Sequence, residues 1–396
     1  MNCKLLKIAL LSSALALAVS TPIAAANAAG FKVLHNFAGG IGDGAGPLGG
    51  VAPAPKGGFY VATDGGGSAN LGTLTLLNKN GTSTVLHSFT GGSDGQNADG
   101  TPMQWTSYDN NIYGTTQFGG PAGCGTIYKY VPSSGAYAQV HAFGCGTDGA
   151  FPFAGLTDTG AGYLLGTGYN GGPSDDGTIV YVTNTGVSGS SCYFSGSDGK
   201  NPYSRVITAN GSSYTVTTAG GAHDLGVVTS YPGESCTTKI LHTFAGGSSD
   251  GATPYGALLE YNNALYGTAS KGGSAGLGVV FRMSLDGSNY TVLHSFQGIN
   301  RNSDGSFPHS GLMLNQMDGM LYGTTINGGN STDLGTVFKI DPTTGVEKVV
   351  YAFSGGDGAH PYGDLYIAQG KVYGTTVAGG ASNFGVVFSL KPKAKG

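Results

Sequence analysis

The sequence predicts an all-β fold, a seven-bladed β-propeller with four-stranded blades whose ring is closed by the N-terminal strand. Three observations predict it: a unit of roughly fifty residues recurs, each unit contains short stretches rich in β-branched and aromatic residues, and one strand is missing from the last unit. The 74 Gly among 396 residues and the 10% of charged residues exclude coiled coils and helical bundles. The 22 Tyr and 17 Phe exclude a disordered chain.

The first 29 residues have the layout of a secretory signal peptide. Lys4 and Lys7 precede an apolar run from Ile8 to Val19, which is too short for a confident membrane span, and small residues end at Ala29. We assign residues 1–29 to the signal peptide and 30–396 to the propeller, and expect a secreted or periplasmic monomer without a membrane span. The remaining 16 basic and 22 acidic residues give a net charge of −6, which does not favour nucleic acid as a partner.

The repeat is clearest in one strand motif, Val-Leu-His-x-Phe. Its best copies are Val85 to Phe89, Ile240 to Phe244 and Val292 to Phe296. Each copy is followed by Asp-Gly and then by a Pro; the seven prolines are Pro47, Pro102, Pro152, Pro202, Pro254, Pro308 and Pro361. Three further apolar stretches complete the unit, so we name the four strands a, b, c and d, with the motif in strand d.

The strand count predicts how the ring closes. Seven complete sets of strands a, b and c begin near Gly50, Met103, Phe153, Tyr203, Tyr255, His309 and Tyr362. Only six d strands follow such a set. The seventh is Val33 to Phe37 at the start of the mature chain, which can complete the last blade and leave no unpaired sheet edge.

Four cysteines remain after signal removal, an even number that suggests two disulfides in an exported chain. We call the end with the d-to-a and b-to-c connections the top of the ring. The blade assignment places Cys124 and Cys145 at the top of one strand pair, and Cys192 and Cys236 near the bottom starts of d strands in adjacent blades. We therefore predict the pairs 124–145 and 192–236.

The repeated strings resemble a known family. They are similar to the GloVer-type tandem β-propeller repeats of exported bacterial proteins, and the similarity covers nearly all of the mature chain. The strings that carry it are Leu321 to Thr325, Gly328-Gly329, Gly335 to Phe338 and Val292 to Phe296. A more distant similarity is to kelch and WD propellers. The resemblance implies a propeller and an exported protein, and the C-terminal Lys391 to Gly396 lacks the anchor of many members. It implies no particular chemistry.

Two repeated polar residues are interpreted as structural, and no metal or cofactor is predicted. An Asp precedes Gly in every d-to-a loop, but one carboxylate per blade disperses the charge that calcium needs, so a turn-capping role is favoured. The d-strand histidines are replaced by Tyr193 and Tyr351 in two blades, which favours packing over ligation. These histidines are His35, His87, His141, His242 and His294.

The residue after each loop proline is the main candidate for binding. These residues begin the innermost strand and should surround the top mouth of the channel; they are Leu48, Met103, Phe153, Tyr203, Tyr255, His309 and Tyr362. Aromatic rings of this kind suit stacking on sugars or other flat polar ligands. The alternative is that they only pack adjacent blades.

The sequence favours a non-catalytic binding module that takes an extracellular glycan or a surface protein at its top face. The predicted binding residues are Trp105, Phe153, Tyr203, Arg205, Tyr255, His309, His360 and Tyr362. One alternative is a secreted polysaccharide lyase or hydrolase using His223 with Asp224, or His309 with Arg205. The other is a structural envelope or matrix protein. For His223 and Asp224 a solvated loop is the favoured interpretation, because adjacent side chains often diverge.

Overall fold

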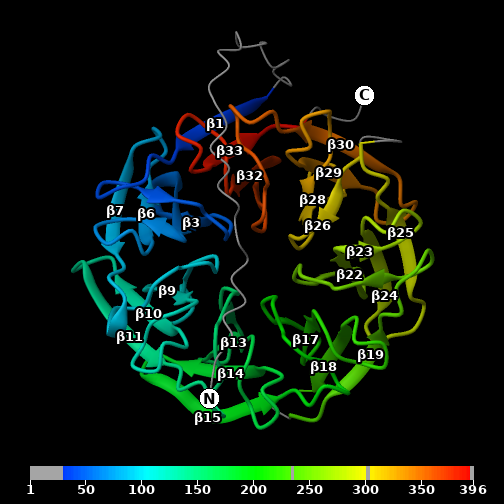
Figure 1. The fold of residues 1–396 in the computed structure, drawn as a ribbon, viewed down its shortest axis with the longest axis horizontal. Coiled ribbons are helices and arrows are strands. Elements are labelled where there is room, and N and C mark those ends of the chain that lie inside the picture. Colours follow the sequence, from blue (N-terminus) through cyan, green and yellow to red (C-terminus); the bar gives the residue numbers. More distant parts are fainter. Residues whose placement is uncertain (1–29, 233–235, 300–303, 393–396) are drawn as a thin grey trace, which may run out of the picture.

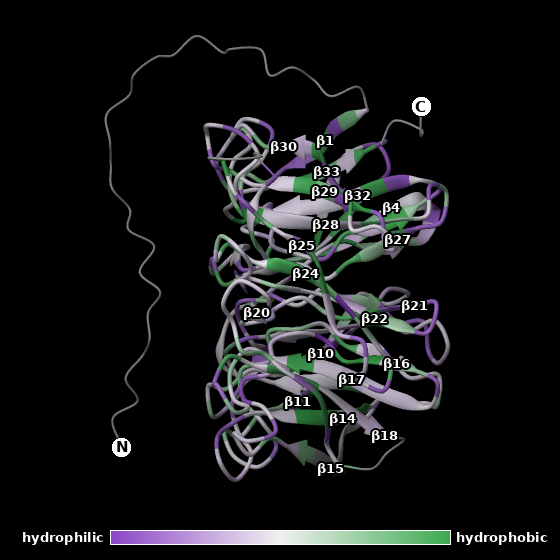
Figure 2. Cartoon of the chain, turned by 90° about the vertical axis from the view of Figure 1, so that its right-hand side faces the viewer, coloured by the Kyte–Doolittle hydropathy of each residue, from purple (hydrophilic) through white to green (hydrophobic). Residues whose placement is uncertain are grey.

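The computed structural model describes residues 30–232, 236–299 and 304–392. The predicted signal peptide, residues 1–29, lies outside them. Seven antiparallel sheets stand around one axis, as Figure 1 shows, so the predicted seven-bladed propeller is confirmed. In the side view, hydrophilic segments concentrate in the loops at the two ends of the ring (Figure 2). The described residues contain no helix long and apolar enough to cross a bilayer.

Each blade has four strands in the order a, b, c and d from the axis outward. Blades 1 and 2 are β3 (Ala52–Ala54), β4 (Gly58–Thr63), β6 (Thr73–Leu77), β7 (Ser83–Ser88), and β8 (Met103–Gln104), β9 (Ile112–Thr116), β10 (Thr126–Val131), β11 (Ala136–Ala142). Blades 3 and 4 are β12 (Thr157–Asp158), β13 (Leu164–Gly168), β14 (Thr178–Thr183), β15 (Gly186–Tyr193), and β16 (Ile207–Ala209), β17 (Ser212–Thr217), β18 (Val227–Pro232), β19 (Lys239–Thr243).

The remaining blades follow the same order. Blades 5 and 6 are β21 (Leu259–Tyr261), β22 (Ala264–Ala269), β24 (Val279–Ser284), β25 (Thr291–Ser295), and β27 (Met313–Asn315), β28 (Met320–Asn327), β29 (Thr336–Ile340), β30 (Glu347–Ala352). Blade 7 is β31 (Tyr366–Ala368), β32 (Lys371–Thr376), β33 (Val386–Leu390) and β1 (Phe31–Asn36). Short strands at the top join d-to-a loops to b-to-c strands or loops: β2 (Gly44–Ala45) with β5 (Gly65–Gly66), β20 (Gly251–Ala252) with β23 (Lys271–Gly272), and β26 (Ser306–Pro308) with β28.

The N-terminal strand closes the ring as predicted. β1 pairs antiparallel with β33, from Phe31 opposite Leu390 to Asn36 opposite Val386. It begins at Phe31, two residues before the predicted strand. The Phe31 ring stacks on Tyr351 of blade 6, with centroids 3.8 Å apart. Blade 7 is therefore made from both ends of the described chain.

The Phe of the strand motif holds each blade to the loop inside it. Its side chain is buried in all seven blades, and its backbone N–H donates to the carbonyl of the Gly that precedes strand c; the residues are Phe37, Phe89, Phe143, Phe194, Phe244, Phe296 and Phe353. The His two residues earlier packs edge-on against this ring, as His87 does on Phe89 at 5.0 Å. The packing contacts predicted for these histidines are present. Tyr193 does not replace His in blade 3, however, because Cys192 lies opposite Ile179 as His141 lies opposite Ile127.

The repeated Asp caps its loop and also pairs with the His of the same blade. Asp43 Oδ1 accepts the N–H of Gly44 and Oδ2 that of Ala38, and His35 Nε2 lies 3.0 Å from Oδ2. The same pair occurs at His87–Asp94, His141–Asp148, His242–Asp250 and His294–Asp304. The turn-capping interpretation is confirmed, and the pairing explains why His and Asp recur together.

One glycine position recurs in all seven blades and accounts for seven of the 74 Gly. It precedes strand c in every blade with φ between +89° and +107°; the seven are Gly72, Gly125, Gly177, Gly226, Gly278, Gly335 and Gly385. A Cβ at Gly226 would collide with the carbonyl oxygen of Thr217 and lie 2.8 Å from Pro254 Cδ of the next blade. Both the backbone conformation and the space require Gly here.

We expect Gly226→Ala to lower the free energy of unfolding by about 3 kcal/mol, because it combines a disfavoured φ with a backbone collision. The control is Gly211→Ala, since Gly211 also has positive φ but nothing within 4 Å of an added Cβ. That variant should lose only about 1 kcal/mol. Urea unfolding of both variants tests this, and equal losses would contradict it.

Both predicted disulfides are present, linking Cys124 to Cys145 and Cys192 to Cys236. The first lies within blade 2 and the second joins blades 3 and 4. The predicted position of Cys192 at the bottom start of its strand is wrong, because β15 begins at Gly186 and Cys192 is its penultimate residue. The sequence pattern identified only the end of this long strand.

Candidate functional site

A cavity of about 260 Å³ lies where the innermost strands of all seven blades meet. Each blade contributes the first residue of the segment that leads into its strand a, together with residues that follow it. The seven opening residues are Leu48, Asp99, Phe153, Tyr203, Tyr255, His309 and Tyr362. We call them the channel ring.

In blade 2 the predicted channel-ring residue is wrong. Asp99, and not Met103, takes the position that is aromatic in five other blades. In the other six blades a loop proline packs on the glycine before strand c of the preceding blade, whereas Ala98 approaches Gly72 in that place. Asn97, just before it, has the positive φ of the residue before proline in the other blades, such as Asn201. Pro102 is therefore not the repeated proline, and the assignment of Met103 to the ring was wrong, although strand β8 does begin at Met103.

Five ring residues form one continuous aromatic cluster. Tyr203 stacks on Phe153 at 4.9 Å and meets Tyr255 and His309 edge-on at 5.0 and 5.3 Å. His309 stacks on Tyr255 at 4.1 Å and lies 3.9 Å from the ring of Tyr362. These contacts join blades 3 to 7, so the rings pack the blades together and at the same time line the cavity.

The opposite side of the ring carries an acidic pair. Asp99 is buried, with 5% of its surface exposed, and its Oδ1 has no hydrogen-bond partner within the described part of the chain. Burial and the neighbouring Asp64 raise the pKa of Asp99 well above its ordinary value. Burial also raises the pKa of Asp64, although the amide of Asn97 donates to its Oδ1 at 2.8 Å. Asp99 thus retains a proton at pH values where an exposed Asp has lost it.

The remaining ring residues are kept neutral by their surroundings. Burial lowers the pKa of His309 to about 3, so its imidazole is uncharged at neutral pH. Burial, Tyr255 and Asp99 raise the pKa of Tyr362 to about 12, and burial, Tyr362 and Asp99 raise that of Tyr203 well above 10. The channel ring therefore offers uncharged hydroxyl and imidazole groups beside the Asp99 carboxyl group, whose raised pKa favours its neutral form.

Arg205 and Asp364 place charged groups in the cavity. Each follows a channel-ring residue, Tyr203 or Tyr362, by two positions in the sequence. Arg205 Nε in blade 4 lies 3.5 Å from Asp364 Oδ2 in blade 7, so the ion pair connects blades that are not adjacent. The other oxygen of Asp364 accepts the backbone N–H of Gly311 at 2.7 Å. Both side chains line the cavity and are only partly buried. Arg205 was predicted to bind ligand, whereas Asp364 and Asp99 were missed.

Two predicted binding residues do not line the cavity. Trp105 is fully buried beside Tyr108 and Tyr113, so its predicted place on the top surface was wrong. His360 Nδ1 lies 3.0 Å from the carbonyl oxygen of Ile326 in the preceding blade. Asn97 and Asn201 contact the preceding blade in the same manner, so His360 occupies a repeated position between blades.

The alternative catalytic pair, His223 and Asp224, does not line the cavity. Asp224 Oδ1 accepts the N–H of Gly220 at 2.8 Å, which closes its own loop. The same bond is made by Asn70, Asp175, Asp333 and Asn383 in other blades, so Asp224 occupies a repeated, loop-closing position. His223 is exposed on the loop.

The comparisons with known proteins agree on the repeat and the fold. The family model described as Gloeobacter/Verrucomicrobia repeat matches residues 23–229 and 205–396. An oligogalacturonate lyase in complex with manganese is 12% identical, with a TM-score of 0.52 over 85% of this chain and 86% of the lyase. A gluconolactonase from Xanthomonas campestris is 12% identical, with a TM-score of 0.45 over 92% of this chain and 89% of that one. No curated protein sequence matches the chain. At this identity the solved structures share only the fold.

Proposed function

The chain belongs to the Gloeobacter/Verrucomicrobia repeat family, and we propose that it is an exported, non-catalytic binding protein that takes a carbohydrate in its central channel. The observation that carries the proposal is the composition of the channel ring. One repeat position supplies Leu48 and Asp99 in two blades and aromatic rings in the other five, and all seven line one cavity. Because the fold accepts different residue types at this position, packing alone does not determine them, and they can be selected for contacts with a ligand.

The chemistry of the cavity fits a sugar. Aromatic faces such as those of Tyr203 and Tyr255 pack against the C–H face of a pyranose ring, while hydroxyl and carboxyl groups bond its hydroxyls. Arg205 and Asp364 add a donor and an acceptor with fixed positions. Because the ring is neutral and the ion pair balanced, a neutral or weakly acidic sugar is favoured over a polyanion.

Export is part of the proposal. Residues 1–29 have the layout of a signal peptide, and the described chain holds two disulfides, which persist in oxidising compartments. We place the mature protein, residues 30–396, in the periplasm or outside the cell.

The test is calorimetric titration of the mature chain with a panel of mono- and oligosaccharides. We expect one class to bind, and Arg205→Gln to weaken that binding at least about tenfold because a charged donor to the sugar is lost. The matched control is Arg282→Gln on β24, since Arg282 is exposed and outside the cavity. No saturable binding, or equal loss in both variants, would refute a channel site for sugars.

A second candidate function is cleavage of a polysaccharide, as a hydrolase or as a lyase, and Asp99 favours it. A carboxyl group that keeps its proton beside a cavity is suited to act as a general acid. The two candidates differ in products: an enzyme releases new reducing ends or unsaturated sugars from a bound glycan, whereas a binding protein returns it unchanged. Measuring product in the same titrated samples decides between them.

A further inference from the structure

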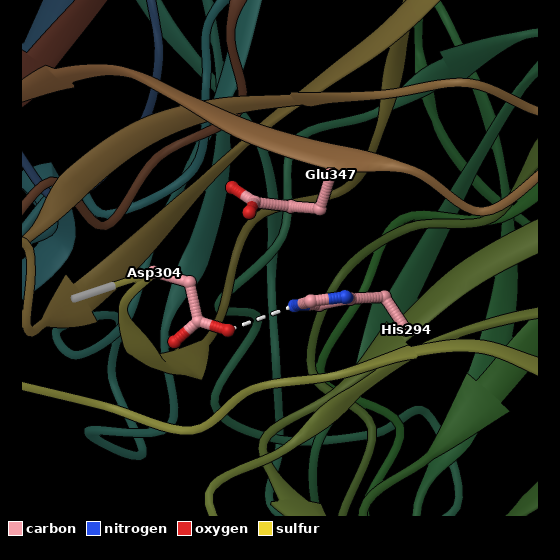
Figure 3. A group of neighbouring side chains, drawn as sticks. All are labelled: His294, Asp304 and Glu347. Atoms are coloured by element: carbon pink, nitrogen blue, oxygen red, sulfur yellow. Dashed lines mark hydrogen bonds and ion pairs between the residues drawn. The ribbon is translucent and has the colours of Figure 1, made fainter. Parts of the chain in front are cut away.

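A second group of side chains lies away from the channel, between the outer strands of blades 5 and 6. His294 is on β25, Asp304 is in the loop that follows it, and Glu347 begins β30 (Figure 3). One ligand atom from each residue lies within 4.8 Å of the other two. Figure 3 shows the Glu347 carboxylate beside the Asp304 carboxylate, which is joined to His294 by a dashed line.

Comparison with other blades shows that Glu347 departs from the repeat. The residue four positions before the d-strand His or Tyr lies against the preceding blade, and it is aromatic in three other blades. Tyr137 stacks on His87 at 3.8 Å, and Tyr290 stacks on His242 at 3.7 Å. Phe31 takes the same place against Tyr351. Blade 6 alone among these puts a carboxylate against the His–Asp pair.

The carboxylate of Glu347 lacks the partner that burial demands. Its Oε1 is completely buried and has no hydrogen-bond partner among the residues that the structure describes. Asp304 is 2% exposed and receives backbone N–H groups from Gln297 and Gly298 as well as His294 Nε2. Burial and the nearby Asp304 raise the pKa of Glu347 to about 8. Two carboxyl groups thus face each other with one imidazole and no described cationic side chain to balance them.

We propose that His294, Asp304 and Glu347 form a binding site for a divalent transition-metal ion, with Zn²⁺ as the best-fitting ion. One imidazole nitrogen and two carboxylate oxygens are established zinc ligands. Ligands at about 2.0–2.1 Å from zinc in tetrahedral geometry lie about 3.4 Å apart, close to the 3.0 Å between His294 Nε2 and Asp304 Oδ2. A small approach of Glu347 completes a three-residue set, and water fills the fourth position.

The ion would bridge two blades. His294 and Asp304 belong to blade 5 and its outgoing loop, whereas Glu347 starts the outer strand of blade 6. At three other blade contacts an aromatic stack takes this place. The metal therefore replaces an apolar contact between blades with a coordinated one, and its binding should be visible as added thermal stability.

The test measures zinc bound per chain by equilibrium dialysis of the mature protein after chelator treatment. We expect wild type to bind one zinc more than Glu347→Gln, and zinc to raise the melting temperature of wild type but not of the variant. Glu347→Tyr is the matched control, because it restores the ring found at Tyr290 and should fold stably without the extra zinc. Equal zinc stoichiometry in wild type and both variants would overturn the proposal.

A gain-of-site variant tests the same idea in the opposite direction. Tyr290→Glu places a carboxylate beside His242 and Asp250, which are paired at 3.1 Å as in blade 5. We expect this variant to bind one zinc more than wild type. If it folds and binds no additional zinc, the inference that a carboxylate at this position completes the site is wrong.

Discussion

A mature chain that begins at Phe37, without β1, is expected to lose more than about 5 kcal/mol of unfolding free energy, a large part of the stability of a typical domain. β1 is the outer antiparallel partner of β33, which pairs on its other side with β32. Its Phe31 also stacks on Tyr351 at 3.8 Å and contacts Phe388 at 5.7 Å. Loss of the strand therefore removes a ladder of backbone hydrogen bonds and opens the contact between blades 6 and 7.

Urea unfolding and size-exclusion chromatography measure this effect. The truncated chain should unfold at lower urea and associate, because β33 becomes an exposed edge. Lys32→Ala is the control, since Lys32 lies on β1 but is exposed, and its effect should stay within about 0.5 kcal/mol. A peptide of residues 30–37 added to the truncated chain should recover part of the stability. A truncated chain as stable as wild type would show that closure contributes little.

Closure could be predicted from the sequence because it follows from counting. The strand motif recurs with the same order of apolar stretches, and the one d strand without a preceding set lies at the opposite end of the chain. The disulfide pairs followed from the same blade assignment, although Cys192 lies at the other end of its strand. Regular hydrogen bonding forces such features to repeat, and repetition is what a single sequence displays.

The site was harder to predict because it depends on departures from the repeat. Asp99 was missed because Pro102, four residues beyond the repeated position, was mistaken for the repeated proline. Asp364 was missed because its partner Arg205 is far away in sequence and meets it only across the channel. Trp105 was assigned to the top surface because the repeat does not require a Trp there, yet its ring is buried between blades. A rare residue type indicates neither exposure nor function by itself.

His309 should make the protein sensitive to acid. Burial lowers the pKa of its imidazole in the folded state to about 3, whereas an unfolded His has a pKa of about 6.5. As the pH falls below 6.5, His309 becomes protonated in the unfolded chain but stays neutral in the folded one. The free energy of unfolding therefore falls. Between pH 7 and about pH 4 this single group should cost about 3 kcal/mol, and the stability is fully present above pH 6.5.

The variant His309→Tyr isolates this contribution. Tyr occupies the same ring position at Tyr255 and Tyr362, so the channel ring should be preserved while the titrating group is removed. Asp99, whose raised pKa has the opposite sign and favours the folded state at acid pH, is unchanged in both proteins. The difference in unfolding free energy between variant and wild type, measured by urea unfolding across this pH range, should therefore shift by about 3 kcal/mol in favour of the variant on acidification. A difference that does not change with pH would mean that the folded protein protonates His309 as readily as the unfolded chain, which requires water or a ligand to reach the imidazole inside the channel.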